Sequence, residues 1–257
     1  KELRVRRLVE DSSGNAGAAV AAYCARAGIK CHIYVPAGTS VGKLAQIRAY
    51  GADVVEVPGT REDTARATLN AARNTYYASH SFNPFFFAGT KTFAFEVWEQ
   101  LGWKAPDALV MSVGNGTLLL GAHTGFAELK AAGEIERLPR IIAVQAAACP
   151  PIERAWRQGL DDVPAVDKRE TLGEGISVAE PVRGPEILRA IRGTGGEVVT
   201  TEEDEIKDAL RFLCRSGYCV EPSYAVAWAG YVKARASGLS SGGITVLPLT
   251  GSGLKAG

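Results

Sequence analysis

Strand-like apolar runs alternate with helix-like segments along nearly the whole chain of 257 residues. Strands are predicted at 7–11, 31–35, 53–57, 108–113, 140–145, 197–200 and 244–249. Helices are predicted at 16–27, 41–50, 61–73, 90–101, 118–131, 185–191, 202–215 and 223–237. This alternation predicts the α/β fold class, with mostly parallel sheets that helices cover on both faces.

Two segments interrupt the alternation. Residues 82–87 place Asn83-Pro84 among aromatic side chains and are predicted to form a loop. Residues 164–185 are rich in Pro, Gly and charged residues, so they are predicted to form a loop or a crossing between domains.

Composition narrows the possible partners. The formal net charge is +1, which provides no field to attract nucleic acid or an anionic membrane. Apolar runs fall short of the roughly 20 residues that span a bilayer. The five cysteines match neither a zinc-binding nor a redox spacing, and we expect reduced, structural thiols, no metal site and a cytoplasmic location.

Three loops rich in Gly and small polar residues follow predicted strands, where doubly wound sheets bind their ligands. They are Ser12–Gly17, Gly114–Thr117 and Thr250–Gly253. Glycine allows close approach of the backbone to a ligand, and a helix start offers N–H groups and a positive dipole end, which suits a phosphate. Taken alone, each loop is better explained as a tight turn, and Ser12 or Ser13 as a helix N-cap.

A dinucleotide site is an alternative for these loops. The spacing from Gly114 is G-x-G-x-x-x-x-G and ends at Gly121, so the third glycine is displaced from the dinucleotide pattern. The strand after Ser12–Gly17 ends in Val35-Pro36 without the acidic residue that would bind a ribose. An NAD(P)-dependent oxidoreductase therefore remains the weaker hypothesis.

Taken in order, the motifs resemble one family. The segments are SSGNAG at 12–17, GTKTFAFEV at 89–97, VGNGT at 113–117, Glu221-Pro222-Ser223, and LPLTGSGLK at 247–255. They are similar to pyridoxal 5'-phosphate (PLP) enzymes with the tryptophan synthase β-subunit fold, and most similar to threonine synthases. The resemblance implies the fold-type II architecture of two doubly wound, mostly parallel α/β domains. Residues 1–80 would belong to the smaller domain and residues 81–257 to the larger, PLP-binding domain.

The resemblance also implies roles for individual residues. Asn15 would bind the phenolic oxygen of the cofactor ring, and Thr250 would place a hydroxyl against the pyridine nitrogen. The carboxylate of a small amino-acid substrate would bind at Ser12, Ser13 and Ala16. The cofactor phosphate would lie on the backbone of Gly114, Asn115, Gly116, Thr117 and Leu118.

The chain departs from the family pattern at three places. The family's Schiff-base lysine lies in an S-F-K-D-R-like segment upstream of the asparagine loop, and this sequence contains no such segment, so no catalytic lysine is assigned. The expectation is a chain truncated at its N-terminus, without the first strands of the larger domain and inactive as it stands; the alternative is a PLP-binding remnant without catalysis. Ser252 also stands where many threonine synthases have His. Gly116-Thr117 differs from the Ala-Gly-Asn variant that is common in the phosphate loop of the family.

The functional prediction is a PLP-dependent lyase acting on a small amino acid, most specifically the conversion of O-phosphohomoserine to threonine and phosphate. Threonine or serine dehydration and cysteine synthase-like β-replacement are alternatives that the same loops fit. A homodimer is expected from the resemblance alone.

Overall fold

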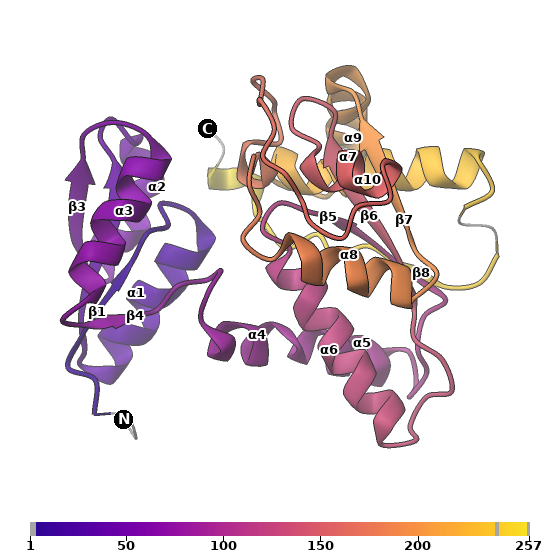
Figure 1. Ribbon diagram of the computed structural model, residues 1–257, viewed down its shortest axis with the longest axis horizontal. Coiled ribbons are helices and arrows are strands. Elements are labelled where there is room, and N and C mark those ends of the chain that lie inside the picture. The colour runs from indigo at the N-terminus through magenta and orange to yellow at the C-terminus, as the bar shows by residue number, and fades with distance from the viewer. Residues whose placement is uncertain (1–3, 240–241, 256–257) are drawn as a thin grey trace. The chain divides into compact units, whose positions relative to one another are not determined.

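The computed structural model describes residues 4–239 and 242–255 (Figure 1). The chain divides into two compact units, one up to Phe86 and one from Phe87 onward. The assignment of residues 1–80 and 81–257 as the smaller and larger domains stays a prediction. Each unit has its own sheet and its own core, so we describe them separately.

The first unit contains a parallel sheet in the order β3-β2-β1-β4. Its strands are β1 (Arg7–Glu10), β2 (Lys30–Pro36), β3 (Asp53–Val57) and β4 (Tyr76–Tyr77). Its helices are α1 (Asn15–Ala27), α2 (Val41–Ala49) and α3 (Arg61–Ala72). Alternate residues of β2 are buried, and Ile33 and Val35 pack with Leu44 and Ile47 of α2 in the core.

The second unit contains a parallel sheet in the order β7-β6-β5-β8 (Figure 1). Its strands are β5 (Ala108–Ser112), β6 (Arg140–Ala146), β7 (Glu197–Thr201) and β8 (Thr245–Val246). Its helices are α5 (Thr92–Gln100), α6 (Thr117–Ala131), α7 (Pro151–Arg157), α8 (Gly184–Gly193), α9 (Glu203–Arg215) and α10 (Pro222–Ala236), with short turns η1 (Glu174–Ile176) and η2 (Gly253–Lys255).

Both faces of this second sheet are covered. Leu109 and Ile141 pack in one core cluster with Phe126 of α6 and Ile187 of α8. Their neighbours on the other face belong to a second cluster, in which Val110, Ile142 and Val144 join Val226 and Ala234 of α10. The nearly continuous apolar sequences of β5 and β6 follow from burial on both faces, as in parallel sheets generally.

The α/β class and the parallel sheets predicted from the sequence are confirmed. The loop predicted at 82–87 is wrong in part, because helix α4 spans Pro84–Thr90 and precedes α5. Asn83 Oδ1 accepts a hydrogen bond of 3.0 Å from the Phe85 N–H, and Pro84 takes the first helical position, so Asn-Pro acts here as a helix start. Every residue of α4 is exposed or half-buried. Its sequence therefore lacks the periodic apolar positions from which a helix is predicted.

Within the described residues, none of the helices combines the length and the apolar character that a membrane crossing requires.

Candidate functional site

The first predicted loop, Ser12–Gly17, connects β1 to α1. Helix α1 begins at Asn15 with Gly14 as its N-cap. The alternative that Ser12 or Ser13 is the N-cap of this helix is therefore wrong. The buried Ser12 instead accepts a hydrogen bond of 3.2 Å from the Gly14 N–H at its own Oγ. The Asn15, Ala16 and Gly17 amides precede the first intrahelical bond, which Ala18 donates to the Gly14 carbonyl at 3.1 Å.

Close packing restricts residue 17 to glycine. A Cβ at Gly17 would overlap the carbonyl oxygen of Ser12. Gly14, in the same turn, has room, since its nearest neighbour would be Ser12 Oγ at 3.8 Å. The loop is therefore folded back on the end of β1, with Asn15 and Ala16 on the side away from the core.

The second predicted loop, Gly114–Thr117, connects β5 to α6. Gly114 is buried, and a Cβ there would lie 2.9 Å from Ile176 Cα and 3.1 Å from the Ile176 carbonyl oxygen. Gly116 is the N-cap of α6 with φ +71°, and a Cβ there would overlap the side chain of Ile187. Both glycines thus pack closely against neighbouring segments, Gly114 against the backbone of η1 and Gly116 against α8, and a side chain at either position would prevent this approach.

The start of α6 has the properties of an anion site. Among the described residues no side chain caps it, and its first turn contains no acidic residue. The Thr117, Leu118 and Leu119 amides precede the first intrahelical bond, which Leu120 donates to the Gly116 carbonyl at 2.9 Å. A long helix with uncapped N–H groups and the positive end of its dipole favours a bound phosphate.

Gln145, which sequence reasoning did not single out, supports the second loop. It is 1% exposed, and its Nε2 donates to the Val113 carbonyl at 3.2 Å, directly before Gly114. Its Oε1 accepts from the Glu153 N–H at 3.1 Å. A polar residue in an otherwise apolar strand was the available signal in the sequence.

The third predicted loop begins at Thr250, four residues after β8. Strand β8 lies beside β5 in parallel, with Val246 opposite Leu109, so the loops at Gly114 and Thr250 leave the same edge of the same sheet. The Glu221 N–H donates to the Gly251 carbonyl at 3.0 Å, and the Gly253 N–H donates to the Cys219 carbonyl at 3.0 Å. The backbone of this loop is therefore held against the segment that starts α10, and Thr250 is exposed.

The structure brings two of the three predicted loops to one sheet edge. Both Gly114–Thr117 and Thr250 belong to the second unit, whereas Ser12–Gly17 belongs to the first. The common site for all three loops stays a prediction, as do the individual roles of Asn15, Thr250, Ser12, Ser13 and Ala16.

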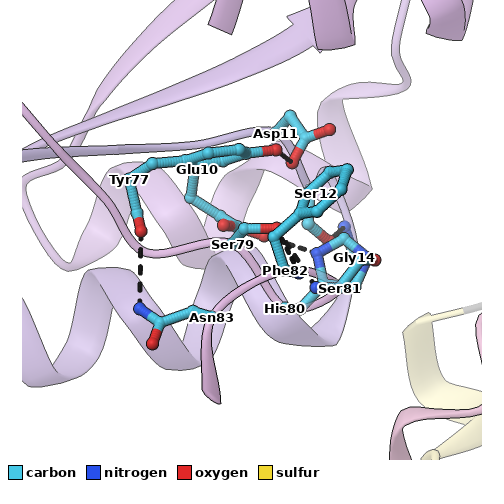
Figure 2. A network of polar contacts seen from close by, with 10 residues as sticks. All are labelled: Glu10, Asp11, Ser12, Gly14, Tyr77, Ser79, His80, Ser81, Phe82 and Asn83. Carbon is cyan, nitrogen blue, oxygen red and sulfur yellow. Dashed lines mark hydrogen bonds and ion pairs between the residues drawn. The ribbon is translucent and has the colours of Figure 1, made fainter. Parts of the chain in front are cut away.

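A buried ionisable pair that the sequence did not assign lies beside the first loop (Figure 2). Glu10, the last residue of β1, is fully buried, and its Oε1 lies 2.6 Å from His80 Nδ1. Burial raises the pKa of Glu10, and its contact with His80 partly opposes that shift. Next to it, Tyr77 donates its hydroxyl to Asp11 Oδ1 at 2.7 Å, and burial together with the Asp11 charge raises the pKa of Tyr77.

The fold and the loops define the class: an α/β protein with parallel sheets and glycine-rich turns at the carboxyl ends of its strands. The sequence model of the family described as "Pyridoxal-phosphate dependent enzyme" matches residues 1–251. The chain therefore belongs to that family, and the cofactor predicted from the motifs is the family's cofactor.

Two relatives with moderate sequence identity to this chain are threonine synthases. The chain is 36% identical to the threonine synthase of Methanocaldococcus jannaschii over 258 aligned residues. The alignment covers 99% of this chain and 64% of that protein. It is 34% identical to the threonine synthase of Methanosarcina acetivorans, covering 97% of this chain and 62% of that protein. The chain thus spans somewhat less than two thirds of the length of these relatives.

Solved structures agree on the fold. The processed form of threonine deaminase isoform 2 from Solanum lycopersicum superposes with a TM-score of 0.83 at 22% identity, over 98% of this chain and 71% of that one. Serine racemase from Dictyostelium discoideum superposes with a TM-score of 0.80 at 24% identity, over 98% of this chain and 78% of that one. The fold is that of the fold-type II PLP enzymes, as the sequence resemblance predicted.

Proposed function

We propose that this chain forms the greater part of a threonine synthase, which converts O-phosphohomoserine and water to threonine and phosphate. The observation that carries the proposal is the identity of 34–36% with threonine synthases over almost the whole of this chain. Membership of the PLP-dependent family supports the coarser statement that the chain is part of a lyase.

The residues of the second loop fit the cofactor phosphate. At Gly114 and Gly116 the lack of a Cβ allows the turn to pack against Ile176, Val178 and Ile187, and no side chain among the described residues caps the first N–H groups of α6. The backbone of Gly114, Asn115, Gly116, Thr117 and Leu118 would hold the phosphate by N–H donation and the helix dipole. Once bound, the cofactor supplies an electron sink for chemistry at the amino-acid substrate, while the protein supplies orientation and electrostatics.

The other predicted residues would orient the ring and the substrate. Asn15 would donate an amide hydrogen bond to the phenolic oxygen, and Thr250 would present a neutral hydroxyl to the pyridine nitrogen. A hydroxyl leaves that nitrogen less basic than a carboxylate partner would, which favours elimination and replacement over transamination. Ser12, Ser13 and the Ala16 amide at the start of α1 would bind the substrate carboxylate through hydrogen bonds.

The proposal is tested on the product of the complete gene. We expect phosphate release from O-phosphohomoserine in the presence of PLP, with threonine formed in equal amount. Threonine and O-acetylserine with sulfide serve as competing substrates, because dehydration and β-replacement fit the same loops. Turnover of either of these without phosphate release from O-phosphohomoserine would assign one of the sibling reactions instead, and PLP binding without turnover of any substrate would indicate a non-catalytic remnant.

A further inference from the structure

The pair formed by Glu10 and His80 leaves one buried oxygen atom unexplained. Glu10 is fully buried, yet its Oε2 has no hydrogen-bond partner among the described residues. A proton on Oε2 would not resolve this, because the resulting O–H would lack an acceptor. A buried carboxylate oxygen without a partner costs free energy, so the site calls for a further group.

Asp11 and His80 form a set of candidate metal ligands together with Glu10 (Figure 2). Glu10, Asp11 and His80 each offer one ligand atom, and these atoms all lie within 4.8 Å of one another. The surroundings are enclosed, since the side chain of His80 is 14% exposed and that of Glu10 is 0% exposed. Tyr77 donates to Asp11 Oδ1 at 2.7 Å and so fixes the orientation of that carboxylate, as partners of metal ligands commonly do.

We propose that Glu10, Asp11 and His80 bind one divalent transition-metal cation of the Mn²⁺ or Zn²⁺ type. Two carboxylates and one imidazole form a mixed oxygen and nitrogen set that suits these ions. The proton that lies between Glu10 Oε1 and His80 Nδ1 leaves when the cation takes its place, so both atoms become ligands. The cation also supplies the partner that Oε2 lacks.

The cation has a structural consequence for the first loop. Glu10 and Asp11 are the two residues directly before Ser12, and His80 follows β4, seventy positions from Glu10. Coordination joins the end of β1 to the segment after β4 through one centre. It also offsets the negative charge of two carboxylates beside the start of α1. This inference goes beyond the proposed function and does not depend on it, because all three ligands lie within the first unit.

Mn²⁺ is the probe for the test, because it binds oxygen ligands and discriminates against the free cysteines of the chain. The 257-residue chain is freed of metal with a chelator and titrated with Mn²⁺, and the loss of the free-ion electron paramagnetic resonance signal counts bound ions. We expect one Mn²⁺ per chain, displaced by Zn²⁺, and a rise of the thermal unfolding midpoint at saturation.

Substitutions of the proposed ligands test whether these side chains bind the ion. Glu10→Gln and Asp11→Asn are each expected to lower Mn²⁺ affinity at least about tenfold. Asp53→Asn is the matched control, because Asp53 forms a histidine–carboxylate pair with His32 at 3.7 Å on the same sheet, and it should bind like the parent.

Asp11→Asn decides the test if Glu10→Gln fails to fold, since Asp11 is half-buried and asparagine still accepts the Tyr77 hydrogen bond. No Mn²⁺ binding by the parent, or equal affinity in Asp11→Asn and Asp53→Asn, would overturn the proposal. A water molecule would then be the partner of Oε2.

Discussion

The starts of α1 and α6 are similar in sequence and opposite in electrostatics. Both follow a parallel strand, both have a glycine N-cap, and both carry glycines that close packing requires. Helix α1, however, follows two carboxylates at Glu10 and Asp11, whereas the turn before α6 packs against the backbone of Ile176 and the apolar side chains of Val178 and Ile187. The same backbone motif therefore has different ligand preferences.

Charge explains the difference. At the start of α6 the first turn contains no acidic residue that would oppose the attraction between the helix dipole and a phosphate. At the start of α1, a negative ligand would approach two carboxylates, and their repulsion has to be offset by His80 or by a cation. The second loop is thus suited to a dianion, and the first to hydrogen bonding with a ligand of smaller charge.

The largest expected effect tests the close packing of the first loop. In Gly17→Ala, the new Cβ overlaps the Ser12 carbonyl oxygen, and backbone atoms cannot move aside as a flexible side chain can. We expect a loss of about 3 kcal/mol in the free energy of unfolding, measured by urea denaturation. Gly14→Ala in the same turn is the control and should lose less than about 1 kcal/mol, and equal losses in the two variants would contradict the packing argument.

The second prediction concerns the second loop, which we propose as the cradle of the cofactor phosphate. Gly116→Ala places a Cβ at φ +71° and against Ile187, so the loop must shift away from its present geometry. We expect the affinity for PLP to fall at least about tenfold, equivalent to about 1.4 kcal/mol, as measured by equilibrium dialysis.

Gly133→Ala is the matched control for Gly116→Ala. It has φ +78° just beyond the other end of α6, with open space around its Cβ position. It carries the same left-handed backbone strain but should leave PLP affinity unchanged. A similar loss of affinity in both variants would show that strain alone, and not the cradle, is responsible.

The smallest expected effect concerns pH. Burial raises the pKa of Glu10 above the value of 4.5 that it has when exposed, so the folded state favours the protonated carboxyl. The stability that this proton contributes is fully present below about pH 4.5 and is lost as pH rises through the raised pKa. The free energy of unfolding of the parent, measured with urea in metal-free buffer, should therefore fall as pH rises over this range. The free energy of unfolding of Glu10→Gln should change less with pH. The same dependence of the free energy of unfolding on pH in the parent and in Glu10→Gln would contradict this prediction.

Much of the fold could be predicted from the sequence because its signals are local. The β5–α6 and β1–α1 turns were located correctly from the glycines and from the change in periodicity at Ser12 and Gly114. Strand β4 was missed because two residues carry no pattern, and α7 was missed because it is short and begins at Pro151. Helix α4 was predicted as loop because its aromatic side chains follow no burial pattern.

The sequence by itself determined the parallel α/β class, the positions of the three glycine-rich loops and the family to which they belong. Only the tertiary structure decided what surrounds each loop. Glu10 and His80 are seventy positions apart and meet because β1 pairs with β4, and Ile187 reaches Gly116 because α8 packs beside α6. A local motif depends on neighbouring residues in the sequence, whereas its electrostatic environment depends on strand pairing and helix packing between distant segments.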